Sequence, residues 1–289
     1  MPSRNASPYR RLAAALMAAL VIAGTMSLAI GATSFARSGA TVPEPTSVTF
    51  QQQASPGAPI PITPLTGVTS LDATVVINVD GTVDGKPTTG DLTAKLTTND
   101  QAMSQIDVTG SLLGEVVAKV GGAAVKLFRP SKVSVYGVPA GAYVVVSGFL
   151  DVCVQAKDPS STAALDQLSP QGLMTILTSS DVARGTFVGD ETLNGMAVKH
   201  YVINGEAFLA AAQSSSDPTV NTFAQSLTSA TDADLYVAAD TGYPVAYRGG
   251  FGGTFEPLQF DGDLTVAIDV TGIDNNTPVT LPGACDHPV

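Results

Sequence analysis

The side chains that could carry out hydrolysis or bind a metal are few in this chain, and their spacing fits no catalytic arrangement. The histidines of the 289-residue sequence are His200, in the middle of a strand-like run, and His287, in the tail. A serine hydrolase needs a nucleophile, a base and an orienting acid, yet no Gly-x-Ser-x-Gly motif is present. Neither a His-Glu-x-x-His motif nor another set of His, Cys and acidic residues has metal-ligand spacing. We therefore expect a protein that is not an enzyme, with a structural His200, no metal site and no cofactor.

Glycine-containing motifs that resemble phosphate and calcium loops are better explained as turns. The segment 248–253 is glycine-rich, but no helix follows it to present N–H groups to a phosphate, so we interpret it as a turn or bulge. The Asp-Gly pairs at 80–81 and 84–85 and the Asp-Gly-Asp at 261–263 lack the ligand spacing and the closing Glu of a calcium loop. These three sites are typical of hairpin turns.

The two cysteines, Cys153 and Cys285, predict a disulfide. Cys153 lies on a strand-like run and Cys285 lies four residues from the end of the chain. An even number of cysteines in an exported chain favours a disulfide, and this one would fix the C-terminal tail to the sheet.

The amino-terminal segment is a membrane-targeting signal. Residues 12–36 contain no charged side chain, and three arginines precede them, which places the N-terminus in the cytoplasm and the body of the protein outside. Ser34-Phe35-Ala36 fits a signal-peptide cleavage site, whereas the apolar run 12–32 is long enough to span a bilayer. Residues 1–36 are therefore a signal peptide or an N-terminal membrane anchor. The protein is expected on the extracytoplasmic side of the cell membrane, or secreted if the segment is cleaved.

The chain after this segment divides into a spacer and one domain. Residues 37–66 contain six prolines and few charges, which predicts a disordered spacer that spans roughly 30 Å. Residues 67–289 are the folded domain. Because three of the 14 basic residues lie in the first eleven positions, the chain after Ala36 carries 11 basic and 25 acidic residues, a net charge of −14. Such an acidic surface disfavours nucleic-acid binding.

The domain alternates between strand-like and helix-like segments. Alternating apolar and polar residues indicate antiparallel strands in its first and last parts. Strand-like runs lie at 71–79, 91–99, 102–112, 123–128, 131–136, 143–154, 183–205, 233–239, 243–251 and 262–272. Two helical stretches interrupt them, one from Ser161 through Leu177 and one over 206–229. This order predicts an α+β fold, in which a curved antiparallel half-barrel sheet carries the helices on its concave face.

Three segments of the domain resemble the LppX/LprG family of exported lipoproteins, whose fold is related to LolA. They are the helical segment 168–177, the strand–turn–strand segment 189–205 and the strand–turn–strand segment 233–251. The resemblance implies a half-barrel whose helices enclose a large apolar cavity, and a carrier of multi-acyl lipids or glycolipids. The chain departs from the family in lacking an N-terminal Cys to bear a lipid, and in having the proline-rich spacer.

We therefore expect a monomer that binds or transports a lipid or another apolar ligand in an internal hydrophobic cavity, outside the cytoplasm. The alternatives are a membrane-anchored envelope sensor or protein-interaction module with the same fold, and an exported hydrolase. The apolar residues expected to line the cavity are Val75, Ile77, Leu92, Leu96, Ile106, Leu173, Leu177, Phe223 and Leu227. An acyl chain in such a cavity needs few polar partners, because about 0.8 kcal/mol per buried CH₂ comes from the hydrophobic effect.

Overall fold

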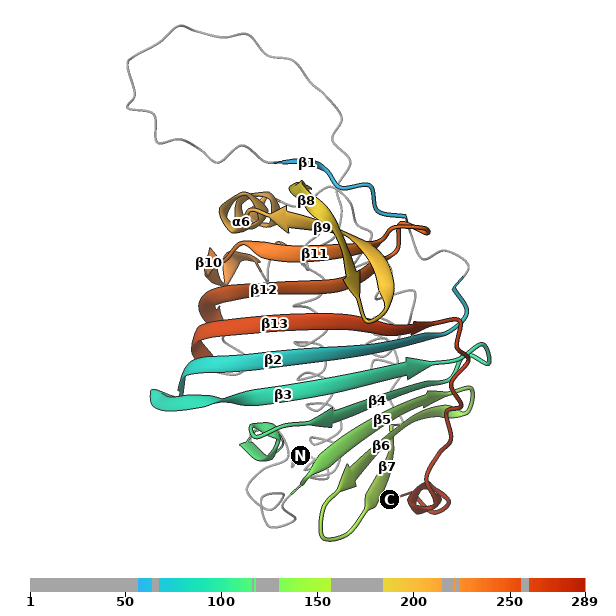
Figure 1. The fold of residues 1–289 in the computed structure, drawn as a ribbon. Helices are drawn as coiled ribbons and strands as arrows, with labels where there is room; N and C mark the ends of the chain where they lie inside the picture. Colours follow the sequence, from blue (N-terminus) through green and yellow to red (C-terminus); the bar gives the residue numbers. More distant parts are fainter. Residues whose placement is uncertain are drawn as a thin grey trace, which may run out of the picture.

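Most of the described chain forms one curved antiparallel sheet (Figure 1). The computed structural model describes residues 57–63, 68–115, 117, 130–156, 184–214, 221, 224–255 and 260–288. The sheet does not close, and β1 and β7 lie at its two edges. The expected antiparallel, curved sheet is confirmed.

Thirteen strands of the described residues belong to this sheet, in the order β1-β8-β9-β11-β12-β13-β2-β3-β4-β5-β6-β7, with β10 paired to β12. Their bounds are β1 (Ala58–Pro59), β2 (Leu71–Val83), β3 (Lys86–Thr98), β4 (Ser104–Thr109), β5 (Lys132–Val138), β6 (Gly141–Ser147), β7 (Val152–Ala156), β8 (Arg184–Leu193), β9 (Met196–Ile203), β10 (Leu227–Ala230), β11 (Ala233–Ala238), β12 (Pro244–Phe255) and β13 (Phe260–Ile273). Neighbours in sequence are mostly neighbours in space, but β2 pairs with the last strand, β13. The two ends of the domain therefore meet at the centre of the sheet.

Two tight hairpin turns set the register of the sheet. Asp84 and Gly85 join β2 to β3, and Asn194 and Gly195 join β8 to β9; all four have positive φ, between 51° and 80°. Positive φ at both central residues favours Asp-Gly and Asn-Gly pairs, and the twist of such turns matches that of the strands. The turns expected at 84–85 and after Leu193 are confirmed.

The turns expected at 80–81 and 261–263 are wrong, because both segments lie inside long strands. Gly81 on β2 is paired with Gly262 on β13. A Cβ on Gly81 would approach the Phe260 ring to 2.7 Å, and a Cβ on Gly262 would approach the same ring to 3.0 Å. The closest contacts are with backbone: a Cβ on Gly81 would lie 2.3 Å from the Asp261 carbonyl oxygen, and one on Gly262 would lie 2.4 Å from the Asp80 carbonyl oxygen. The two glycines thus allow a close approach of the paired strands and of the Phe260 ring, and they do not change the chain direction.

The turn or bulge expected at 248–253 is instead part of strand β12, and the register shift beside it lies in β10, between Leu227 and Ser229. Gly253 lies opposite Leu227 of β10, and a Cβ on it would approach the Ser226 carbonyl oxygen to 2.3 Å. A Cβ on Gly252 would come within 2.5 Å of the Ser229 hydroxyl. These glycines let β10 lie close against β12 while β12 also pairs with β13 along its length.

The single strand-like run expected at 143–154 is in fact two strands, β6 and β7. They pair with each other from Ala142↔Ala156 to Val146↔Val152, so the chain reverses over residues 148–151. The polar and glycine residues at 147–148 and Asp151 are turn-forming, but Phe149 and Leu150 between them mimic a continuous strand in the sequence. The strand expected at 123–128 lies outside the described residues.

The second helical stretch ends a few residues earlier than expected. Helix α6 spans Gly205–Gln213 and begins at Asn204, whose side-chain oxygen accepts a 2.9 Å hydrogen bond from the Ala207 amide. Residues 221, 224 and 225 are also helical. The expected extent of 206–229 is wrong only in its last residues, because β10 begins at Leu227 and pairs with β12. The first helical stretch, around 161–177, lies outside the described residues.

Residues 57–63, which the sequence places in the proline-rich spacer, lie against the domain. Ile60 is only 4% exposed and belongs to the core, and Arg184 Nε donates a 3.0 Å hydrogen bond to the Gly57 carbonyl. The Thr63 amide donates to the Gly242 carbonyl over 2.9 Å. We call residues 57–63 the strap, because they cross the edge of the sheet at β8. The spacer is thus shorter at its C-terminal end than the sequence indicates.

None of the helices in the described part of the chain combines the length and apolarity that crossing a membrane requires. The apolar segment 12–36 lies outside that part.

Candidate functional site

One face of the sheet carries a continuous row of apolar side chains. Residues paired across antiparallel strands point to the same face, so the register defines the row. It runs through Leu235, Tyr247, Ile268, Val75, Ala94, Val108, Val133, Val146 and Val152. The row therefore crosses nine strands, from β11 to β7, and we call the face that bears it the apolar face.

Five of the predicted lining residues lie on this face of β2, β3 and β4. Ile77 is paired with Leu92, and Leu96 is paired with Ile106, while Val75 belongs to the row itself. Ile77, Leu96 and Ile106 are buried in the core, whereas Val75 and Leu92 are half-buried.

Of the other four predicted lining residues, the structure describes Leu227 alone. Leu227, on β10, is buried in the same cluster as Ile77. Leu173, Leu177 and Phe223 lie outside the described residues.

Burial along the apolar face is uneven, and this unevenness marks the candidate site. One buried cluster includes Leu235, Tyr247 and Phe251, and a second includes Val133, Val135 and Val144. On β2, β3 and β4, away from the β2–β3 hairpin, five apolar side chains of this face are only half-buried and pack against one or the other of the two clusters. These are Val75, Val79, Leu92, Ala94 and Val108, which we call the apolar strip. A strip of half-buried aliphatic groups beside two buried clusters is a surface that an apolar ligand can cover.

Sequence reasoning missed three members of the strip, although a signal for them was present. Val79 continues the alternation of Val75 and Ile77, Ala94 lies between Leu92 and Leu96, and Val108 follows Ile106 by two residues. Period-two alternation assigns all of them to one face. What it cannot assign is which positions of that face remain accessible, because this depends on the packing at either side.

Helix α6 closes one end of the apolar face. Phe208 of α6 contacts Phe251 of β12 with ring centroids 5.9 Å apart, and Ala212 is fully buried in the same cluster. Tyr247 lies beneath, where burial raises the pKa of its phenol well above the ordinary value. A Cβ on Gly249 would come within 2.5 Å of the Tyr247 hydroxyl, so this glycine makes room for the ring. This end of the face is a packed core, and the strip begins beyond it.

The opposite face of the same strands carries polar and charged side chains. His200 on β9 lies between two carboxylates: its Nδ1 is 2.8 Å from Glu191 Oε1 and its Nε2 is 2.7 Å from Asp234 Oδ1. The imidazole also stacks on Tyr236, with centroids 4.5 Å apart. Burial lowers the pKa of His200, but the hydrogen bonds and charges of Asp234 and Glu191 outweigh burial and raise it above 6.5.

This arrangement makes His200 a structural residue. Both ring nitrogens are engaged by carboxylates, so neither is positioned to take a proton from a nucleophile. When it is protonated, the ring donates to an acid on either side and so joins β8, β9 and β11. Within the described ranges, no group of three or more His, Cys, Asp or Glu side chains is arranged to hold a metal ion.

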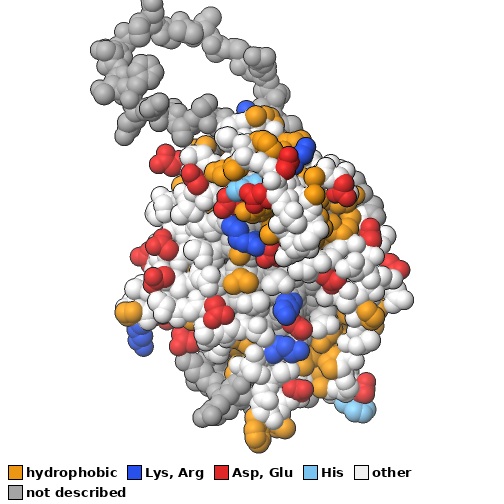
Figure 2. All heavy atoms as spheres, viewed as in Figure 1, with side chains coloured by type: hydrophobic (Ala, Val, Ile, Leu, Met, Phe, Trp, Pro, Cys, Tyr) orange, Lys and Arg blue, Asp and Glu red, His pale blue; other side chains and the backbone are white. Residues whose placement is uncertain are grey.

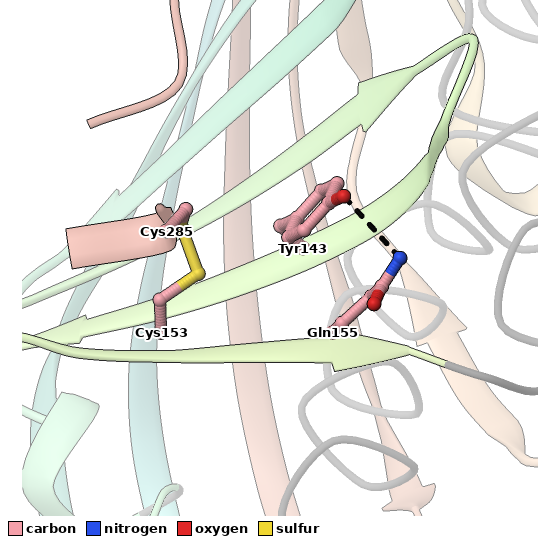
Figure 3. The surroundings of a disulfide bond; sticks show 4 residues. All are labelled: Tyr143, Cys153, Gln155 and Cys285. Carbon is pink, nitrogen blue, oxygen red and sulfur yellow. Dashed lines mark hydrogen bonds between the residues drawn. A yellow bond between two sulfur atoms is a disulfide. The ribbon is translucent and has the colours of Figure 1, made fainter. Parts of the chain in front are cut away.

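The C-terminal tail is fixed to the polar face by the predicted disulfide, which is confirmed (Figure 3). Cys153 of β7 and Cys285 of the 3₁₀ turn η2 (Gly283–Cys285) are joined, with Cα atoms 5.2 Å apart. The adjacent Gln155 amide donates a 3.2 Å hydrogen bond to the Tyr143 hydroxyl. Val279 of the tail is buried in a cluster with both cysteines. The edge strand β7 is thereby held on two sides, by β6 and by the tail.

The molecular surface is acidic on the face that Figure 2 displays. Acidic side chains are spread over this face, with a few Lys and Arg between them. This distribution agrees with the net charge of the chain and presents no continuous basic path for a phosphate backbone.

Comparison with solved structures aligns three proteins with most of this chain. LprF from Mycobacterium bovis aligns over 76% of this chain and 91% of its own, with 15% identity and a TM-score of 0.39. A DUF1329 family protein from Desulfovibrio piger aligns over 75% of this chain and 89% of its own, with 10% identity and a TM-score of 0.22. An outer membrane lipoprotein-sorting protein domain from Vibrio parahaemolyticus aligns over 74% and 88%, with 8% identity and a TM-score of 0.20.

LprF is a member of the LppX/LprG family, which the sequence resembles. No model of a known protein family matches the sequence, and no curated protein matches it. All three TM-scores are below 0.5, so we take the function from this chain's own side chains.

Proposed function

We propose that this protein is a non-enzymatic, extracytoplasmic carrier that holds the acyl chains of a lipid, or another apolar ligand, against the apolar strip. The observation that supports it most is the half-burial of Val75, Val79, Leu92, Ala94 and Val108, beside side chains of the same face that are buried. These side chains are aliphatic and offer no hydrogen bond or charge. A ligand for them must therefore be recognised by its apolar surface.

The dimensions of the strip suit an acyl chain. Val75 and Val79 are four residues apart on β2, which is about 13 Å at the strand rise, and β2 to β4 spans about 10 Å. About ten methylenes buried there would contribute about 8 kcal/mol. That free energy corresponds to roughly micromolar affinity before the cost of immobilising the ligand. A ligand with several chains, which also reaches beyond the strip, would bind more tightly.

Ala94 occupies the centre of the strip, with Val75 opposite on β2 and Val108 opposite on β4. Its side chain is the smallest of the strip and is half-buried, so a phenyl ring at this position would cover part of the neighbouring side chains. In the proposed carrier, the strip lies on the concave side of the curved sheet. Leu173, Leu177 and Phe223 remain predicted lining residues. The N-terminal segment 1–36 anchors the domain to the membrane, or is cleaved to release it.

The test is a pair of substitutions on one strand. Ala94→Phe places a phenyl ring in the strip, and Thr93→Phe places the same ring on the opposite face one residue earlier, opposite Val76. Binding of a fluorescent polyene fatty acid, whose emission rises in an apolar site, is titrated for both. We expect Ala94→Phe to weaken binding at least tenfold and Thr93→Phe to leave it within about twofold of the original.

Equal effects of the two substitutions, or no binding by the unsubstituted chain, would contradict the proposal. Capture of a stable protein partner by a chain that takes up no lipid would instead favour the interaction module.

A further inference from the structure

We propose that the tip of the β6–β7 hairpin, Phe149 and Leu150, docks the domain on a lipid bilayer by inserting into its interface. Phe149 is 89% exposed and Leu150 is 61% exposed. No other large hydrophobic side chain among the described residues is as exposed as Phe149. The inference rests on the proposed location at a membrane and is independent of lipid binding by the strip.

The hairpin that presents these side chains is braced. Val146 and Val152 pair at its base, and the Ser147 carbonyl accepts a 2.9 Å hydrogen bond from the Ser131 amide. The disulfide from Cys153 fixes the second strand one residue beyond Val152. Two apolar side chains are thus held outward at a rigid turn, which reduces the conformational entropy that insertion would otherwise cost.

The tip is continuous with the apolar face. The cross-strand row that contains Val75, Ala94 and Val108 ends at Val146 and Val152, the pair that closes the hairpin. A path of apolar side chains therefore leads from the strip to the base of the tip, through Val133 and Val146, which are buried in the second cluster. Docking by this tip would place the end of that path at the bilayer.

The charge near the tip favours an uncharged lipid surface. Asp151 is the one charged residue of the turn 148–151. Because the chain after Ala36 carries a net charge of −14, anionic lipids would repel the domain. The occupant that fits is the interface of a zwitterionic bilayer, where an aromatic ring and a leucine side chain are favourable.

The tether is long enough for this orientation. The strap leaves the sheet at β1, and β7 lies eleven strand spacings away, which is about 53 Å along the curved sheet. The segment 37–56 holds twenty residues and spans at most about 70 Å when extended. An anchored domain can therefore lie with the hairpin tip on the same bilayer.

A competing site lies near the other edge of the sheet, at Phe187 and Val188 of β8, which are 51% and 54% exposed. Phe187 contacts the Tyr201 ring edge-on, with centroids 5.5 Å apart, so part of its apolar surface is already covered. Asp190 and Glu191 follow it on the same strand, and their charges oppose entry into a bilayer. Phe187 is therefore the matched control for Phe149.

The experiment uses the absence of Trp from the sequence. The full chain is prepared as Phe149→Trp and as Phe187→Trp, so that each variant holds a single indole. Both are reconstituted into phosphatidylcholine nanodiscs, once with ordinary and once with brominated acyl chains, since bromine quenches an indole only at close range. We expect at least twofold quenching and a blue-shifted emission for Phe149→Trp, and little of either for Phe187→Trp.

A second substitution tests the same tip without a fluorophore. Phe149→Ser combined with Leu150→Ser should leave the thermal midpoint unchanged, because both side chains are exposed. In the original chain we expect the bilayer to slow hydrogen exchange of the hairpin amides, and the double variant should lose this protection. Quenching that is absent from both Trp variants, equal in both, or stronger for Phe187→Trp would overturn the inference. Loss of fatty-acid binding in Ala94→Phe, by contrast, tests the proposed carrier function and not the tip.

Discussion

Breaking the disulfide should cost the domain a large part of its stability. Cys153 and Cys285 are 132 residues apart, so the covalent link closes a very long loop of the unfolded chain. The loop-entropy relation gives about 5 kcal/mol for such a loop at 25 °C. For a domain of this size, that loss lowers the melting temperature by roughly 10–20 °C.

The assay is thermal and urea unfolding of the Cys153→Ala, Cys285→Ala double variant. The original chain with a reducing agent should melt at the same temperature as the double variant without one. The double variant itself should not respond to the reductant. Because Val279, Tyr136 and Val145 still pack together beside the former bond, we expect the sheet to stay folded at 25 °C.

A loss of less than about 1 kcal/mol would refute the reasoning. It would mean that the tail is held by its side-chain contacts alone, or that the unfolded chain already keeps the two ends together. A variant that does not fold at all would show that the tail supplies more than a constraint on the unfolded state.

Two further outcomes follow from the polar residues. The pKa of His200 is raised in the folded state, so the stability that its imidazolium contributes is fully present below pH 6.5 and is lost as the pH rises through the raised value. Urea midpoints measured over about pH 5.5 to 8.5 should therefore fall with pH more steeply in the original chain than in His200→Gln. Parallel curves would contradict the arrangement of His200 with Glu191 and Asp234. Asn204→Ala removes the hydrogen bond that the Asn204 side-chain oxygen accepts from the Ala207 amide, and it should destabilise the domain by about 1 kcal/mol. Asn204→Asp should keep most of that stability. Equal losses in the two variants would show that the hydrogen bond from the Asn204 side-chain amide to Asp232 matters more than the helix cap.

Much of the sheet could be predicted from the sequence because period-two alternation is local. Val75, Ile77 and Val79 alternate with polar residues over β2, and the turns at 84–85 and 194–195 are short-range signals. The disulfide followed from the number of cysteines and the export signal.

The errors came from residues whose conformation is decided by a distant partner. Gly81 and Gly262 have the composition of turns, but they are paired with each other across β2 and β13 and lie against the Phe260 ring. Gly253 lies within a strand because β10 approaches it closely. The turn between β6 and β7 was missed because Phe149 and Leu150 have the composition of a buried strand, whereas in the structure both side chains are exposed.

The sequence predicts which face of the sheet carries the candidate site, but it does not predict which side chains of that face stay accessible. Alternation selects Val75 and Leu92 together with Ile77, Leu96 and Ile106. Whether each is buried depends on the clusters that close on either side of β2–β4. Half-burial is therefore a property of the fold, and it distinguishes the strip from the core.

The carrier function is tested most directly by native mass spectrometry of the chain purified from a host that exports it, followed by organic extraction. We predict a bound mass that organic solvent releases as a lipid with one or more acyl chains, and that Ala94→Phe loses while Thr93→Phe retains it. An unliganded mass in all three proteins, with no uptake of added lipid, would contradict the account.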